Sequence, residues 1–157
     1  WVGVSQLMKI SKKAEYALRA VTAMSRAPLG TTFAIQDIAQ REHIPLKFLE
    51  QILLTLKNGG LLRSKRGVGG GYQLNTPPDQ IALRHVIEPI DGSFDPITCL
   101  HAVGRPQHAC ECGIPGGCAL ARTFVGLGTM VQDWLTTTTI ADVIAKGRAP
   151  DAVSFDI

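Results

Sequence analysis

Apolar side chains recur at three- and four-residue spacing along much of the chain, which is typical of amphipathic helices. A first helix is predicted over residues 12–24, with Ser11 as its N-cap. Its apolar face comprises Ala14, Ala17, Leu18, Val21 and Met24. A second, short helix follows around residues 35–39, and a third covers residues 46–58, between Pro45 and Gly59. Two short helices joined by a tight turn predict a helix-turn-helix.

A glycine-rich hairpin follows the third predicted helix. Residues 61–66 and 72–75 are short extended runs on either side of Gly67-Val-Gly-Gly-Gly71. The same glycines could cradle a phosphate, but they lack the Lys-Ser/Thr of a P-loop and lead into a strand, not into a helix. The hairpin therefore predicts the wing of a winged helix.

The second half of the chain predicts three further helices. The first covers residues 79–89, and the last begins at the capping box of Thr139 and Asp142 and ends near Ala145. Between them, a helix of about 18 residues carries a seam typical of a dimer interface or of packing on its own domain. The seam comprises Leu120, Phe124, Leu127, Val131 and Trp134.

The predicted fold class is mainly α with a small β-hairpin. A winged helix-turn-helix domain is expected over residues 8–90, followed by a cysteine-rich loop over residues 91–118. Residues 119–147 then supply a long C-terminal dimerisation helix and a short last helix. A loop as long as the middle segment usually has a function or is disordered.

Charge divides the chain into a basic and an acidic half. Residues 1–76 hold 11 Lys/Arg and 4 Asp/Glu, whereas residues 77–157 hold 5 and 9, although the net charge is only +3. The basic half is a candidate partner of a polyanion such as nucleic acid. No apolar run approaches the roughly 20 residues that span a bilayer, and residues 1–7 lack a secretory signal. We therefore expect a soluble cytoplasmic protein with no membrane partner.

All four cysteines lie within one 20-residue stretch, as Cys99, Cys110, Cys112 and Cys118. A secreted disulfide scaffold is disfavoured by the missing signal and by the length of the chain. Thiolates bind iron–sulfur clusters, zinc or copper(I), and these spacings match neither structural zinc nor ferredoxin runs. A thiol enzyme would need a low-pKa cysteine beside a base, for which His108 near Cys110 is the only hint, so we expect no enzyme.

Four segments of the sequence resemble one family of bacterial regulators. Residues 8–19, 44–52, 56–61 and 64–72, the last with an Arg-Gly-x-Gly-Gly-Gly-Tyr motif, are similar to the winged-helix regulators typified by IscR, NsrR and RirA, the Rrf2 family. The resemblance covers about residues 8–135. It implies a homodimer that binds a partly palindromic double-stranded DNA operator.

The resemblance also assigns DNA contacts to individual residues. Lys47, Glu50 and Gln51 would face the major groove, and Arg66 would enter the minor groove. Gln can contact adenine through two hydrogen bonds, and Arg is favoured in a narrow groove, so physical chemistry agrees. Arg63 and Lys65 would hold the DNA backbone.

Family members with three cysteines in the long loop hold an iron–sulfur cluster, 2Fe-2S or 4Fe-4S. Cys112 and Cys118 match the last two family ligands, while Cys99 and Cys110 compete for the third place. Some members use a His three residues after the last Cys, but that position is Ala121 here. The first choice for the fourth ligand is therefore Glu15 of the partner subunit, followed by Cys110 and then by His101 or His108.

The resemblance implies that such a cluster controls operator binding by sensing iron, redox state or nitric oxide. Loss of the cluster would then change the angle between the two DNA-contacting heads of the dimer. The alternative is a cluster-free winged-helix repressor whose cysteines form a thiol-redox switch, bind zinc or bind nothing.

Overall fold

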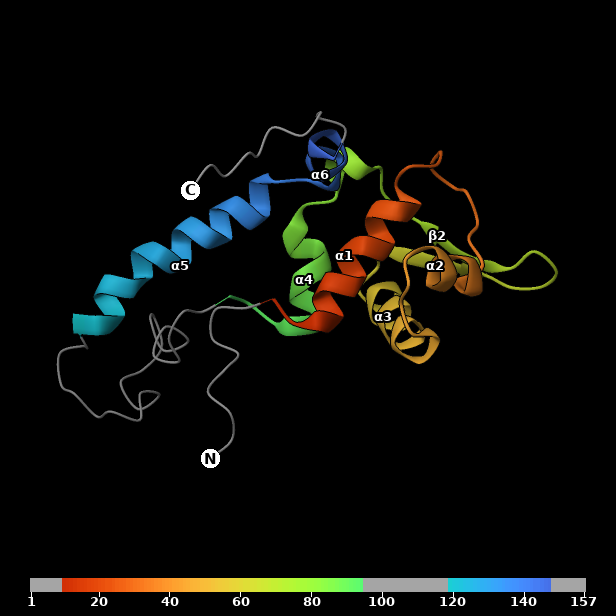
Figure 1. Ribbon diagram of the computed structural model, residues 1–157. Helices are drawn as coiled ribbons and strands as arrows, with labels where there is room; N and C mark the ends of the chain where they lie inside the picture. Colours follow the sequence, from red (N-terminus) through yellow and green to blue (C-terminus); the bar gives the residue numbers. More distant parts are fainter. Residues whose placement is uncertain (1–9, 95–118, 148–157) are drawn as a thin grey trace, which may run out of the picture.

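The computed structural model describes residues 10–94 and 119–147 (Figure 1). The elements are α1 (Lys12–Met24), α2 (Ile35–Arg41), α3 (Leu46–Asn58), β1 (Leu62–Lys65), β2 (Gly71–Leu74), the 3-10 helix η1 (Pro78–Gln80), α4 (Leu83–Asp91), α5 (Ala119–Thr137) and α6 (Ile140–Lys146). Strands β1 and β2 pair antiparallel, with Leu62 opposite Leu74 and Lys65 opposite Gly71. The predicted fold class is confirmed.

A single hydrophobic core joins α1, α3, α4 and the hairpin, and Leu135 of α5 and Ile140 of α6 complete it. Most of the buried face of α1 consists of small side chains, apart from Val21 and Met24, so neighbouring helices can approach closely. Alanines occupy that face at regular three-residue spacing, as Ala14, Ala17, Ala20 and Ala23. Larger side chains fill the core from α3, as Leu49, Ile52, Leu53 and Leu56.

Local caps fix the helix ends as the sequence predicted. The Ser11 hydroxyl accepts a hydrogen bond from the Ala14 amide at 3.0 Å, at the beginning of α1. Thr139 and Asp142 form the predicted capping box of α6, with the Thr139 amide donating to the Asp142 carboxylate at 2.8 Å. The backbone and side-chain hydrogen bonds from Thr139 lower the pKa of the Asp142 carboxyl, so this cap is present at neutral pH and weakens as pH falls through that lowered pKa.

The prediction of one helix over residues 79–89 is wrong. The structure divides this stretch into η1 and α4, with Ile81 and Ala82 extended between them. The Ile140 amide donates to the Ile81 carbonyl and the Leu83 amide to the Thr138 carbonyl, both at 2.9 Å. These backbone bonds to a segment far along the chain override the local helical spacing, although Ile81 is still fully buried. Helix α4 also runs past Pro89 and ends at Asp91.

Helix α5 extends away from the rest of the molecule, on the side opposite the hairpin (Figure 1). Its C-terminal part packs on the core through Leu135 and Val131. Elsewhere along the helix, Leu120, Met130 and Trp134 keep 63%, 68% and 52% of their surface exposed. No helix in the described part of the chain is long and apolar enough to cross a membrane.

The wing is fastened to the segment that precedes α2. Phe33 and Tyr72 exchange both of their backbone hydrogen bonds, each at 2.9 Å, so an isolated β-bridge joins residue 33 to β2. Gly71 allows this close approach, because a Cβ atom there would overlap the Phe33 carbonyl. A glycine is therefore required at the base of the wing.

We expect Gly71→Ala to lower the free energy of unfolding by about 1–3 kcal/mol, since the added methyl group must push two backbones apart. Urea denaturation measures this change. Gly126→Ala is the control and should not destabilise the protein, because a Cβ at Gly126 meets no atom of a neighbouring element within 4 Å and alanine favours the helix. Equal stability of the two variants would contradict the close approach described here.

Candidate nucleic-acid interface

Three of the predicted DNA-contacting residues lie on the solvent face of α3. Lys47, Glu50 and Gln51 are exposed in the first two turns, while the opposite face is buried in the core. The apolar spacing of α3 therefore places these polar side chains outward. In a helix-turn-helix, the N-terminal residues of the second helix contact base edges.

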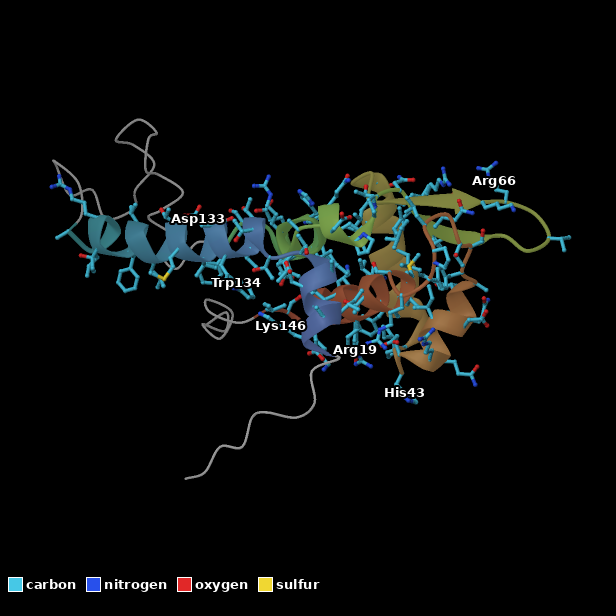
Figure 2. All side chains as sticks on the ribbon, turned by 90° about the horizontal axis from the view of Figure 1, so that it is seen from above. Arg19, His43, Arg66, Asp133, Trp134 and Lys146 are labelled. Carbon is cyan, nitrogen blue, oxygen red and sulfur yellow. The ribbon has the colours of Figure 1, made fainter. Side chains whose placement is uncertain are left out.

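The other three predicted contacts lie in the hairpin. Arg63 and Lys65 are exposed on β1, and Arg66 follows them at the beginning of the turn. Figure 2 shows Arg66 projecting outward from the hairpin. Within the described ranges, neither Lys65 nor Arg66 takes part in an ion pair. Two unpaired cations thus stand on the wing, where they can interact with a polyanion.

Arg63 is held in place by a hydrogen-bond chain that sequence reasoning missed. Its Nε donates to Oε1 of Gln73 at 2.7 Å, and Nε2 of Gln73 donates to Oγ1 of Thr32 at 2.5 Å. Arg63 and Gln73 are directly opposite each other in the hairpin register. Pairing the two predicted strands in this register would have predicted the contact from the sequence. A side chain already fixed in this way loses less rotamer freedom when it binds a phosphate.

The turn between α2 and α3 is tied to α1. The Arg19 guanidinium donates to the backbone carbonyl of Glu42 and lies 3.8 Å from its carboxylate. The next residue, His43, has a φ of 50°, which lets the chain reverse before α3 begins. Its side chain points away from the body of the molecule (Figure 2). These contacts fix the angle at which α3 leaves the turn.

The proposed acidic ligand, Glu15, is exposed in the first turn of α1. Its carboxylate accepts two hydrogen bonds from the Lys12 ammonium, at 2.8 and 2.9 Å. The other predicted ligands lie outside the described residues, as Cys99, Cys110, Cys112, Cys118, His101 and His108. Within residues 10–94 and 119–147, no group of three His, Cys, Asp or Glu side chains could hold a metal ion. The metal site therefore stays a prediction.

The end of α4, which precedes the cysteine-containing segment, contacts the beginning of α1. The Ser11 amide and hydroxyl both donate to the carboxylate of Asp91, at 2.9 and 2.5 Å. Asp91 is the last residue of α4, so this contact joins the end of the winged-helix domain to its beginning. Three residues further on, the Phe94 carbonyl accepts a hydrogen bond from Gln132 of α5 at 3.3 Å.

Comparisons with known proteins agree with this architecture. The model of the Rrf2 family, described as an iron-dependent transcriptional regulator, matches residues 10–146. A candidate HTH-type transcriptional regulator from Haemophilus influenzae is 32% identical over 139 residues, which cover 88% of each chain. The HTH-type transcriptional regulator IscR of Vibrio parahaemolyticus is 29% identical over 141 residues, 90% of this chain and 80% of that one.

A solved structure shows the same fold. The structure of CymR, the global cysteine regulator of B. subtilis, superposes with a TM-score of 0.70 at 25% identity, covering 88% of this chain and 98% of that one. The overall fold of this chain thus occurs in a regulator of known structure. The chain belongs to the Rrf2 family of helix-turn-helix transcriptional regulators.

Proposed function

We propose that this protein is a homodimeric winged-helix regulator whose binding to a partly palindromic operator is controlled by an iron–sulfur cluster. One observation carries the DNA-binding part. The cations Lys47, Lys65 and Arg66 are exposed on α3 and the wing, and none of them forms an ion pair with another described residue. Unpaired cations on these two elements supply the electrostatic attraction that a duplex requires.

In this proposal α3 enters the major groove. Gln51 forms two hydrogen bonds to an adenine, and Lys47 contacts a guanine or a phosphate. Glu50 accepts a hydrogen bond from a cytosine amino group. Its carboxylate disfavours bases whose major-groove edge presents only hydrogen-bond acceptors. Arg66 enters the minor groove, while Arg63 and Lys65 bind phosphates and fix the register.

The exposed apolar residues of α5 support the dimer. Leu120, Met130 and Trp134 lie on one side of the helix. In a monomer their exposed apolar surface would be in contact with water, which is unfavourable in free energy. Because α5 and the hairpin are on opposite sides of the molecule (Figure 1), pairing through α5 leaves both wings accessible. A two-fold dimer then matches two half-sites of opposite orientation.

The cluster would be held by Cys112, Cys118 and one of Cys99 and Cys110, within a loop proposed to begin after Asp91 of α4 and to end at residue 118. Thiolates suit iron–sulfur clusters, and the family model is described as iron-dependent. Glu15 fits the role of an oxygen ligand because its carboxylate is accessible, with 48% of the side chain exposed. When bound, a cluster supplies a centre that reacts with oxygen and nitric oxide.

A series of contacts between described residues connects the beginning of the cysteine-containing segment to α3. The Ser11–Asp91 contact joins α4 to α1, and α1 packs against α3 as well as α4. Arg19 then connects α1 to the turn before α3. A change in the segment after Asp91 would therefore reach the DNA-contacting helix through α1.

Arg66→Ala should weaken operator binding by about 1–3 kcal/mol and reduce discrimination between sequences, whereas Lys65→Ala should mainly lower the salt dependence. Fluorescence anisotropy at several salt concentrations measures both effects, on a duplex selected from a random pool and on a scrambled duplex. Lys146→Ala, which removes the same charge from α6, should change neither. If Arg66→Ala weakens operator and scrambled DNA equally, the minor-groove role is wrong.

Anaerobically purified protein should be brown and should contain iron and acid-labile sulfide. Cys112→Ala and Cys118→Ala should each abolish the cluster, whereas only one of Cys99→Ala and Cys110→Ala should do so. Absorption spectra with iron and sulfide counts decide this. A colourless protein that carries only zinc would favour the cluster-free alternative, and a cluster retained in both Cys112→Ala and Cys118→Ala would refute the ligand assignment.

The wild-type protein should have about twice the 16.9 kDa mass of the chain in solution. Met130→Glu should raise the dimer dissociation constant at least about tenfold, because a carboxylate would be buried in the interface without a partner. Sedimentation equilibrium measures the constant. Thr129→Glu is the control, since Thr129 is also exposed but lies about 100° around α5 from Met130, away from Leu120 and Trp134. A monomeric wild type would overturn the dimer.

A further inference from the structure

Helix α3 carries three large apolar side chains that the core does not bury. Leu46, Phe48 and Leu54 are 40%, 52% and 51% exposed. A single exposed apolar side chain is common on protein surfaces, so exposure alone indicates nothing. Phe48 differs from both leucines because it is aromatic, and it lies in the first turn of the helix, directly after Lys47.

The position of Phe48 on the helix places it beside a predicted base contact. Residues three apart are neighbours on a helix surface, so Phe48 and Gln51 lie side by side. Leu49, Ile52, Leu53 and Leu56 define the buried face of α3, and Phe48 and Gln51 lie outside it. The ring therefore forms one flank of the surface that Lys47 and Gln51 present.

A phenyl ring can neither donate nor accept a conventional hydrogen bond, so it cannot recognise the polar groups of a base edge. The major groove offers one apolar group on its floor, the C5 methyl of thymine. Phosphates would be attracted to the neighbouring cations, which bring the helix close enough for apolar contact. The ring and the methyl group would then exclude water from each other.

We propose that Phe48 is a specificity-determining residue that packs against the methyl group of a thymine, at or next to the base pair contacted by Gln51, in each half-site. This inference rests on the proposed function, because it requires α3 to occupy the major groove of double-stranded DNA. The contact selects thymine over cytosine and over uracil. It adds recognition that Lys47, Glu50 and Gln51 cannot provide.

The experiment replaces single thymines of the selected operator by deoxyuridine, which removes only the methyl group. For the wild type, replacement of one thymine in each half-site should weaken binding about fourfold per site. This factor corresponds to the free energy of removing one methyl-sized group from water. In Phe48→Ala, overall affinity should fall and the same replacement should have no further effect. Phe48→Leu, which keeps an apolar side chain, should retain the sensitivity.

Leu29→Ala is the control variant, because Leu29 is 55% exposed but lies outside α3. It should show wild-type sensitivity to deoxyuridine. The inference is overturned if no thymine of the operator shows methyl dependence, or if Phe48→Ala keeps the wild-type dependence. If no duplex is selected from the random pool, the proposed function falls as well, whereas a selected duplex without this coupling refutes only the role of Phe48.

Discussion

The close packing of α1 against α3 and α4 is the constraint on which the rest of the structure depends. Its buried face consists largely of Ala14, Ala17, Ala20 and Ala23, so the neighbouring helices approach its backbone closely. A larger side chain at these buried positions would push the neighbouring helices outward. The orientation of the α3 surface, and the contact between Ser11 and Asp91, both require this spacing. Small residues inside the domain thus determine where its polar surface lies.

Much of the fold follows from local signals in the sequence. The bounds of α1, α3 and α6 are predictable because Ser11, Pro45 and the pair of Thr139 and Asp142 act within one turn of the helix that each begins. The wing is predictable because glycines separate two short extended runs. In these segments local preference and tertiary packing favour the same structure.

The errors and omissions have non-local causes. The division between η1 and α4 depends on hydrogen bonds to Thr138 and Ile140, far along the chain. The chain from Thr32 through Gln73 to Arg63 depends on strand register and on a loop before α2. In the candidate site, periodicity in the sequence is enough to predict that the α3 and wing residues lie on the surface. The residues that hold them could not be predicted, because they are distant in sequence.

The ion pair between Lys12 and Glu15 has a consequence for any ligand that takes this carboxylate. The Glu15 oxygens already accept hydrogen bonds from an ammonium group one turn away, so a bound cation must displace that group and not only water. Binding there is an exchange between two positive partners. Because dissolved salt screens the exposed pair more than a direct coordination bond, higher ionic strength weakens the competitor first. Lys12 thus acts as an internal counter-ion for the carboxylate of its own helix.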